Sequence, residues 1–173
     1  MARHDTPKIY LQPGDFAFAG AGTQIHTLLG SCISITLWHP RLRIGGMCHF
    51  TLPGRPAQHL ATGEPDGRYA DEALEMFRRA ATRHKTPLAA YQSKIFGGGN
   101  MIRERGQPVD DTVGTRNAAA AMQLLMQEGI EILVAHVGEF GHRRIVFDVA
   151  SGDVWVRHQP TQGKRHESLN GKV

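Results

Sequence analysis

Apolar and polar residues alternate over short stretches through most of the chain, a pattern that predicts many short strands. The strand-like runs cover residues 9–11, 15–18, 25–29, 32–38, 43–52, 93–96, 130–137, 143–149 and 154–158. Two other segments, roughly 69–84 and 115–128, repeat their apolar residues at helical spacing. About nine strands and two helices predict an α+β fold in which sheets outnumber helices.

Each predicted helix has a single apolar stripe. The first stripe consists of Ala70, Leu74, Phe77 and Ala81, and the second of Ala118, Met122, Leu125 and Met126. Because one face is apolar and the other is polar, each helix is expected to cover the face of a sheet. Thr115 is the candidate N-cap of the second helix, and Gly129 is its candidate C-cap.

Residues 9–158 contain all of these elements and are expected to form one domain, since 173 residues and 19.0 kDa leave no room for two of full size. The ends, 1–8 and 159–173, are polar and aperiodic, as flexible tails are. Residues 53–67 are rich in proline and glycine and are expected to be an exposed loop. The chain has neither an apolar run of 18 residues nor an apolar signal segment near its start, which favours the cytoplasm and excludes insertion into a membrane.

The net charge of +4 raises the question of nucleic-acid binding, and the position of the charge argues against it. Three of the four net positive charges lie in the segments 1–8 and 159–173, and the residues between them contain no basic run with interleaved aromatics. Two cysteines, Cys32 and Cys48, are too few for a disulfide framework.

The segment TLLGSCISITLW contains the first candidate for chemistry. Gly30 and Ser31 interrupt an apolar run, so the chain is expected to bend just before Cys32. A thiol at such a bend is exposed and lies beside free backbone N–H groups, which can hold the oxyanion of an acyl-transfer reaction. The alternative is that Cys32 is a small buried apolar residue, as many free cysteines are.

The segment RIGGMCHFTLP contains the second candidate, His49. Strand alternation sends the side chains of Cys48 and His49 to opposite faces, so a thiol partner for His49 has to come from Cys32. Gly45 and Gly46 leave space beside the histidine, which favours a functional role over that of a hydrogen-bonded core histidine.

Two other readings of these residues stay open. The histidines and cysteines include no CxxC, HxH or HExxH spacing, so a metal site requires ligands that converge from distant strands. The loop in KIFGGGNM lacks the spacing of a nucleotide-binding motif, and either it is a tight turn or it is a flexible wall beside the site with Asn100 as a polar contact. In GTRN, Arg116 and Asn117 fall in the first turn of the second helix, where a structural role is favoured.

Taken together and in this order, LLGSC, GGMCHFTLP, YADEAL, KIFGGGNM, GTRN and HVGEFGHRRIVFDVASGDVWVR resemble the chemoreceptor glutamine deamidase family CheD from about residue 14 to residue 158. The resemblance implies an αββα sandwich, similar in fold and catalytic plan to the deamidase domain of cytotoxic necrotizing factor toxins. It also implies hydrolysis of glutamine side chains in methyl-accepting chemotaxis receptors to glutamate and ammonia, without a cofactor. The chemotaxis phosphatase CheC is a further partner known for the family.

The resemblance also assigns roles to residues. It implies Cys32 as the nucleophile, His49 as the base and Thr27 as the third residue of the site. The bend itself adds the backbone of Gly30 and Ser31 as the candidate for holding the oxyanion. In that mechanism a nearby His49 is expected to lower the pKa of the Cys32 thiol. Two rival classes remain: a metal-dependent hydrolase or oxidoreductase that uses Cys48 and His49, and a non-catalytic chemotaxis adaptor.

Overall fold

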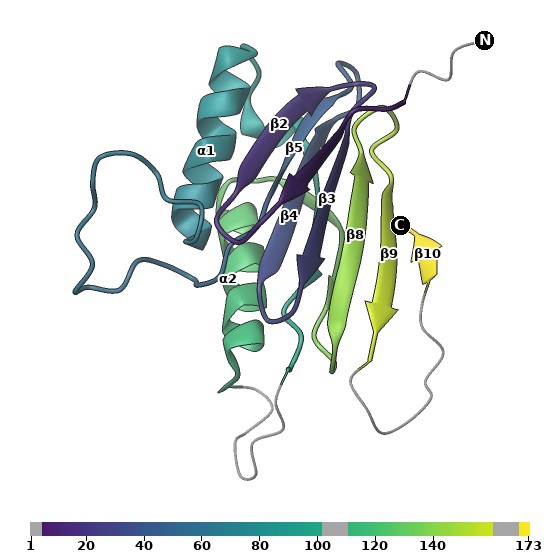
Figure 1. The fold of residues 1–173 in the computed structure, drawn as a ribbon. Helices are drawn as coiled ribbons and strands as arrows, with labels where there is room; N and C mark the ends of the chain where they lie inside the picture. Colours follow the sequence, from purple (N-terminus) through teal and green to yellow (C-terminus); the bar gives the residue numbers. More distant parts are fainter. Residues whose placement is uncertain (1–4, 102–110, 161–169) are drawn as a thin grey trace.

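The computed structural model describes residues 5–101, 111–160 and 170–173 (Figure 1). Its strands are β1 (Lys8–Leu11), β2 (Phe16–Gly20), β3 (Gln24–Leu29), β4 (Ile33–His39), β5 (Ile44–Cys48), β6 (Gln92–Gly97), β7 (Glu131–Val137), β8 (His142–Asp148), β9 (Val154–Gln159) and β10 (Asn170–Lys172). Its helices are α1 (Ala70–Arg83), the short 3₁₀ helix η1 (Leu88–Ala90) and α2 (Val113–Gln127). All nine predicted strands and both predicted helices are present, so the α+β prediction is confirmed.

The strands form two sheets of five. Sheet A has the order β1-β3-β8-β9-β10, and sheet B has the order β2-β5-β4-β6-β7. Most neighbours are antiparallel, and the parallel pairs are β1 with β3 and β6 with β7. Consecutive strands at the start of the chain alternate between the two sheets. The chain passes from β3 in sheet A to β4 in sheet B through only Gly30, Ser31 and Cys32.

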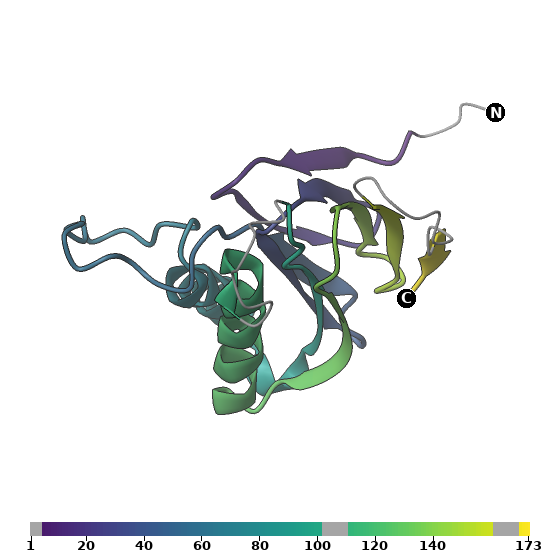
Figure 2. The same ribbon diagram turned by 90° about the horizontal axis from the view of Figure 1, so that it is seen from below.

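The molecule has three layers, in which both helices cover sheet B and sheet A lies on its other side (Figure 2). One apolar cluster joins the helices to sheet B, with Phe77, Leu125 and Ile35 among its members. A second cluster fills the space between the sheets and includes Ile25, Met47 and Phe147. The αββα arrangement that the resemblance implied is wrong for the described residues, because no helix among them covers the outer face of sheet A.

The helix faces match the predicted stripes with one exception. Ala70, Leu74, Phe77 and Ala81 are all buried, as expected for α1. In α2 the buried residues are Gly114, Asn117, Ala118, Ala121 and Leu125, whereas Met126 is 72% exposed. The inward face of α2 is centred on the side of Asn117 and Ala121, which turns Met126 to solvent. The N-cap is Thr112, whose hydroxyl accepts a hydrogen bond from the Thr115 N–H, so the predicted cap at Thr115 is wrong.

The segment 159–173, which was expected to be a flexible tail, contains strand β10. Asn170–Lys172 pair with β9 in antiparallel register, and Val173 and Val154 exchange two backbone hydrogen bonds of 2.8 Å. Lys172 also forms an ion pair with Asp153. No helix in the described part of the chain is both long enough and apolar enough to cross a membrane.

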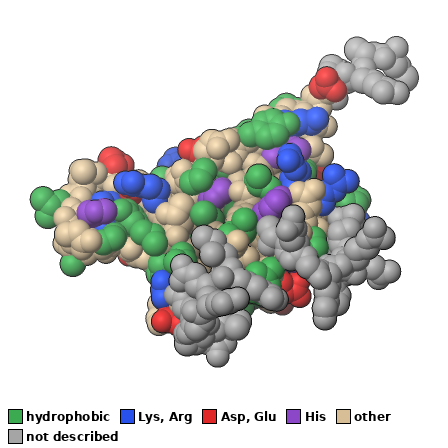
Figure 3. Space-filling view, turned by 60° about the horizontal axis from the view of Figure 1, so that its bottom comes forward, with side chains coloured by type: hydrophobic (Ala, Val, Ile, Leu, Met, Phe, Trp, Pro, Cys, Tyr) green, Lys and Arg blue, Asp and Glu red, His purple; other side chains and the backbone are tan. Residues whose placement is uncertain are grey.

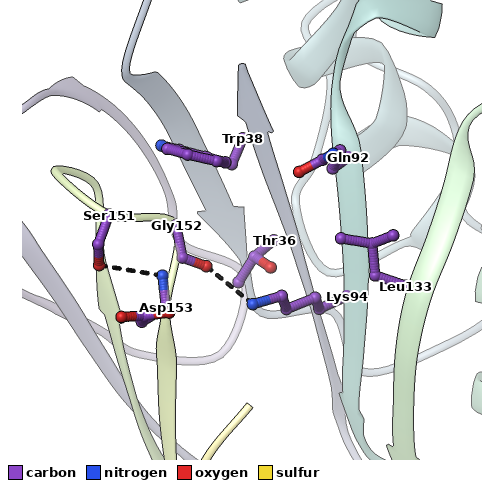
Figure 4. A pocket seen from close by; sticks show the side chains of 8 residues that line it. All are labelled: Thr36, Trp38, Gln92, Lys94, Leu133, Ser151, Gly152 and Asp153. Carbon is purple, nitrogen blue, oxygen red and sulfur yellow. Dashed lines mark hydrogen bonds between the residues drawn. The ribbon is translucent and has the colours of Figure 1, made fainter. Parts of the chain in front are cut away.

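A cavity of about 170 Å³ lies near the far end of β4 from Cys32 (Figure 4). Trp38 lines this cavity. It follows Cys32 by six residues, and six residues of extended strand separate the two by about 20 Å. The Lys94 ammonium in this cavity already donates hydrogen bonds to the carbonyls of Gly152 and Val173. The candidate residues of the sequence analysis therefore lie elsewhere.

Candidate active site

The register between β4 and β5 places Cys32 and His49 on the same face of sheet B. Thr36 pairs with Met47, and the same register continues beyond β5 to Ile33 and Phe50, which exchange backbone hydrogen bonds of 3.1 and 2.9 Å. This alignment makes Cys32 and His49 diagonal neighbours across the two segments, a relation in which residues lie about 7–8 Å apart. Both side chains face the space between the sheets, where Cys32 packs against the second apolar cluster.

Cys48 lies on the opposite face, as strand alternation predicted. It is fully buried in the cluster beneath the helices, and its sulfur accepts a hydrogen bond of 3.5 Å from the Ile35 N–H. Burial raises the pKa of this thiol to about 12. Cys48 and His49 therefore do not share a site, which removes the geometric basis for a metal centre built on this pair.

His49 is held by Thr27, which reaches it from sheet A. The Thr27 hydroxyl lies 2.7 Å from Nδ1 of His49 and donates a hydrogen bond of 2.9 Å to the Leu11 carbonyl. Because a hydroxyl has only one proton, it accepts from Nδ1–H, and the imidazole carries its lone pair on Nε2. Nε2 is buried and has no hydrogen-bond partner within the described residues. The pair thus presents a basic nitrogen in a fixed orientation.

The ionisation of the two candidate residues differs from the expectation. Burial lowers the pKa of His49 to about 4, with a smaller opposing effect from the charge of Asp15. Burial also raises the pKa of the Cys32 thiol, and the backbone N–H of Cys32 offsets only part of this. The prediction of a lowered thiol pKa is therefore wrong for the resting structure. At neutral pH the pair is a thiol and a neutral imidazole.

The bend before Cys32 is anchored through its carbonyl groups. The Gly30 carbonyl accepts from the Gly99 N–H and the Cys32 carbonyl from the Gly98 N–H, both at 2.9 Å. The Ser31 carbonyl accepts from the Asn117 side chain at 3.1 Å. In contrast, the N–H groups of Ser31 and Cys32 have no carbonyl acceptor within the described residues, and that of Cys32 interacts with its own sulfur. The bend therefore exposes backbone donors next to the thiol.

The glycine loop packs directly behind this bend. Gly97 and Gly98 have φ values of 111° and 64°, and a Cβ on Gly97 would lie 2.2 Å from the Cys32 carbonyl oxygen. The loop is therefore a close-packed support for the nucleophile bend rather than a flexible wall. Asn100 follows it, and its backbone N–H donates to the Glu139 carbonyl at 2.7 Å. No hydrogen bond from the Asn100 side chain to a described residue is present, so its side chain is free for an incoming group.

Arg143 supports the site, and no local motif in the sequence marks it. Its side chain is 1% exposed and donates to Nδ1 of His136 at 2.8 Å and to the carbonyls of Gly97 and Gly138 at 3.2 and 2.7 Å. It thereby ties the end of β6, where the glycine loop begins, to the end of β7. His136 accepts this hydrogen bond from the guanidinium through Nδ1.

An exposed hydrophobic side chain borders the candidate site. Met101 packs against Gly30 at the bend before Cys32, whereas the exposed Leu28 lies on the outer face of sheet A because it alternates with the inward-facing Thr27. Figure 3 views the molecule from the end at which β3 terminates, and hydrophobic and histidine side chains gather in the middle of that face while acidic ones lie toward its margins. Such a surface suits contact with another protein better than it suits a small charged ligand. Among the described residues, no three of the types His, Cys, Asp and Glu come together as metal ligands.

Known proteins match this chain over most of its length. The family model described as CheD chemotactic sensory transduction matches residues 51–158, a range that begins after Cys32 and His49. A protein of Pseudomonas savastanoi pv. phaseolicola named "Probable chemoreceptor glutamine deamidase CheD" is 47% identical over 156 residues, which cover 90% of this chain and 86% of that protein.

Two further relatives extend the comparison. A protein of Albidiferax ferrireducens named "Probable chemoreceptor glutamine deamidase CheD 2" is 48% identical over 160 residues, which cover 90% of each chain. A Leptospira interrogans protein named "Probable chemoreceptor glutamine deamidase CheD 1" is 33% identical over 153 residues, or 86% of this chain and 90% of that protein. On the extent and identity of these matches, the chain belongs to the CheD family.

Proposed function

We propose that this protein is a protein-glutamine deamidase that hydrolyses glutamine side chains of methyl-accepting chemotaxis receptors through a thioester on Cys32. The names of the relatives give the substrate class. One observation carries the assignment of residues: Thr27 accepts from Nδ1 of His49 and so leaves Nε2 basic on the face that Cys32 shares. A thiol, an oriented base and free backbone donors are the groups that amide hydrolysis through a thioester requires.

The first half of the reaction forms the thioester. Nε2 of His49 takes the proton of the Cys32 thiol as the sulfur attacks the side-chain carbonyl carbon of glutamine. The negative charge that develops on the oxygen is held by the N–H groups at the bend from Gly30 to Cys32, with Ser31 as a donor that no described carbonyl occupies. His49 then gives its proton to the nitrogen, the C–N bond breaks and ammonia leaves.

The second half regenerates the enzyme. A water molecule gives a proton to Nε2 of His49 while its oxygen attacks the thioester carbon. The C–S bond breaks, the sulfur takes the proton back from His49, and the glutamine has become glutamate. Because burial lowers the pKa of His49 to about 4, its imidazolium returns the proton readily to the leaving group, whereas the same burial makes the neutral imidazole a weaker base toward the thiol.

The pH profile of the reaction tests the ionisation of the pair. Because burial lowers the pKa of His49 to about 4 and raises that of Cys32, the thiol–imidazole form is present between these limits. We expect kcat/KM for a glutamine peptide to be constant from about pH 5 to about pH 8. A fall on the acid side with a midpoint near 6.5, the ordinary value for histidine, would show that His49 is not buried as described.

The substitution Cys48→Ser tests the division of labour between the cysteines. A hydroxyl in the apolar cluster beneath the helices should lower the free energy of unfolding by about 1–3 kcal/mol, measured by urea denaturation. The deamidation rate of the folded protein should stay within about twofold of the parent, because Cys48 lies on the opposite face from His49. A large loss of rate with unchanged stability would indicate that Cys48 takes part in the chemistry.

The experiment that tests the function is incubation of the purified protein with receptor cytoplasmic fragments. Conversion of particular glutamines to glutamate, seen by peptide mass mapping, together with an equal amount of released ammonia, is expected. Treatment with a chelator should leave the rate unchanged. Binding of the fragments without any change in their mass would favour a non-catalytic adaptor, and inhibition by the chelator would favour a metal-dependent hydrolase.

Other expectations from the sequence and from the family resemblance stay predictions. These are a single domain over residues 9–158, a cytoplasmic location and binding of the chemotaxis phosphatase CheC. We also propose a catalytic plan similar to that of the deamidase domain of cytotoxic necrotizing factor toxins. This likeness rests on the resemblance to the CheD family.

A further inference from the structure

Asn117 lies in the second turn of α2 with its side chain turned toward the nucleophile bend. It is fully buried, and its Nδ2 donates hydrogen bonds to the Ser31 carbonyl at 3.1 Å and to the Thr51 carbonyl at 2.9 Å. Carbonyl oxygens only accept hydrogen bonds, so these two partners fix which end of the amide faces them. One side chain thus uses both of its N–H groups to link two separate segments.

The two carbonyls flank the two candidate catalytic residues. Ser31 immediately precedes Cys32, and Thr51 follows His49 by two positions. In the register of the two segments, Thr51 is opposite Cys32, one step beyond the pair Ile33 and Phe50. Asn117 therefore acts at the point where the segment of the nucleophile and the segment of the base pass each other.

The backbone does not hold the segments together at this point. Beyond Phe50 the N–H groups of Thr51 and Leu52 both donate to the Arg68 carbonyl, so this chain turns away from the nucleophile bend. The last backbone hydrogen bonds between the two segments join Ile33 and Phe50. Within the described residues, the Asn117 amide links Ser31 and Thr51, just beyond that pair, by binding both carbonyls.

Other residues anchor α2 beside Asn117. α2 is anchored by buried Ala118, Ala121 and Leu125, and Gly114 packs against the Gly98 carbonyl. The Oδ1 atom of Asn117 is buried without a hydrogen-bond partner in the described part of the chain. An apolar residue would leave no such atom, so the amide is unfavourable for packing alone and gains its use from its two donors.

We propose that Asn117 is a positioning residue that fixes the separation of the Cys32 thiol and Nε2 of His49. This inference rests on the proposed function for the roles of those two residues. Asn117 does not touch the reacting atoms. It acts through the carbonyls of Ser31 and Thr51, and its loss lets the nucleophile bend and the His49 segment move apart while the sheets and helices remain in place.

The test compares Asn117→Ala with Leu125→Val, a control in the buried face of α2 that contacts neither carbonyl. We expect Asn117→Ala to lower kcat for a receptor glutamine about 10–100-fold with KM within about twofold, and Leu125→Val to keep kcat near that of the parent. Asn117→Asp, which keeps the shape and replaces the donors with an oxygen, should lose as much as Asn117→Ala. It serves as the readout if the alanine variant does not fold. Unchanged kcat in the folded Asn117 variants would overturn the proposal.

A second measurement separates positioning from general destabilisation and does not depend on deamidation. The rate at which iodoacetamide alkylates Cys32, followed by mass mapping, reports how well His49 assists the thiol. In the parent protein, His49→Gln should slow alkylation about tenfold or more. In the Asn117→Ala protein, the same substitution should slow it by less than about threefold. This difference would show that the effects of the two residues are coupled. An equal effect of His49→Gln in both backgrounds would contradict the proposal. If the parent does not deamidate receptor fragments, the proposed function fails, whereas this cycle still decides the role of Asn117.

Discussion

The substitution Cys32→Ala is expected to abolish deamidation, with a loss of kcat of about four orders of magnitude or more. The substitution removes the atom that attacks the glutamine, and no other thiol can take its place. Cys48 is buried on the opposite face of sheet B, and burial raises its thiol pKa to about 12. The rate is measured by ammonia release from receptor fragments under conditions where the parent turns over many times.

The structure of the Cys32→Ala protein should be unaffected, because Cys32 is half-buried at a bend that is anchored through backbone carbonyls. An unchanged melting temperature and circular dichroism spectrum are the control. Turnover by the well-folded variant at a rate near that of the parent would rule out a thioester on Cys32.

The substitution His49→Gln is expected to have the second-largest effect, lowering kcat about 10²–10⁴-fold. Glutamine is polar and of similar size, and it lacks the basic nitrogen that takes the thiol proton and returns it to the leaving ammonia. KM should change little, because the substrate is bound by the surface around the site and not by the imidazole. The measurement is a full kinetic curve with a receptor fragment.

A rate within a few-fold of the parent would mean that another base acts. His26 is the nearest histidine in the chain to the Thr27 position. It precedes Thr27 in β3, so its side chain faces the other side of sheet A, where its ring lies 4.8 Å from that of Tyr10. His26 is therefore not placed to replace His49 at the Cys32 side.

The sequence predicted the strands well because each is marked by a local pattern. Alternation alone also predicted that Cys48 and His49 face opposite ways. The prediction is confirmed, because Cys48 lies in the cluster beneath the helices and His49 contacts Thr27 of sheet A. Strand β10 was missed because Asn170–Lys172 contain no apolar residue to produce a pattern. The αββα arrangement of layers came from the family resemblance and was wrong, and helical periodicity could not correct it, because periodicity shows that a helix covers a sheet and not which sheet.

The contacts around the site could not be predicted, because they depend on residues far apart in the chain. Arg143 and Asn117 donate hydrogen bonds to backbone carbonyls. Every residue has a backbone carbonyl, so the sequence does not indicate which one a side chain binds. The ionisation of Cys32 and His49 was misjudged for a related reason: the pKa values follow from burial between two sheets, which local sequence does not reveal. The family resemblance implied that Thr27 belongs to the site, but its hydrogen bond with His49 is visible only once the two sheets are in place.

The most direct test of a thioester on Cys32 is deamidation of a receptor fragment in the presence of hydroxylamine. Hydroxylamine attacks a thioester faster than water does, so the glutamines that are normally converted to glutamate should instead appear partly as hydroxamates. Cys48→Ser should give the same products and Cys32→Ala neither product. Formation of glutamate alone, at an unchanged rate and at every hydroxylamine concentration, would show that water attacks the amide directly and would contradict the thioester mechanism.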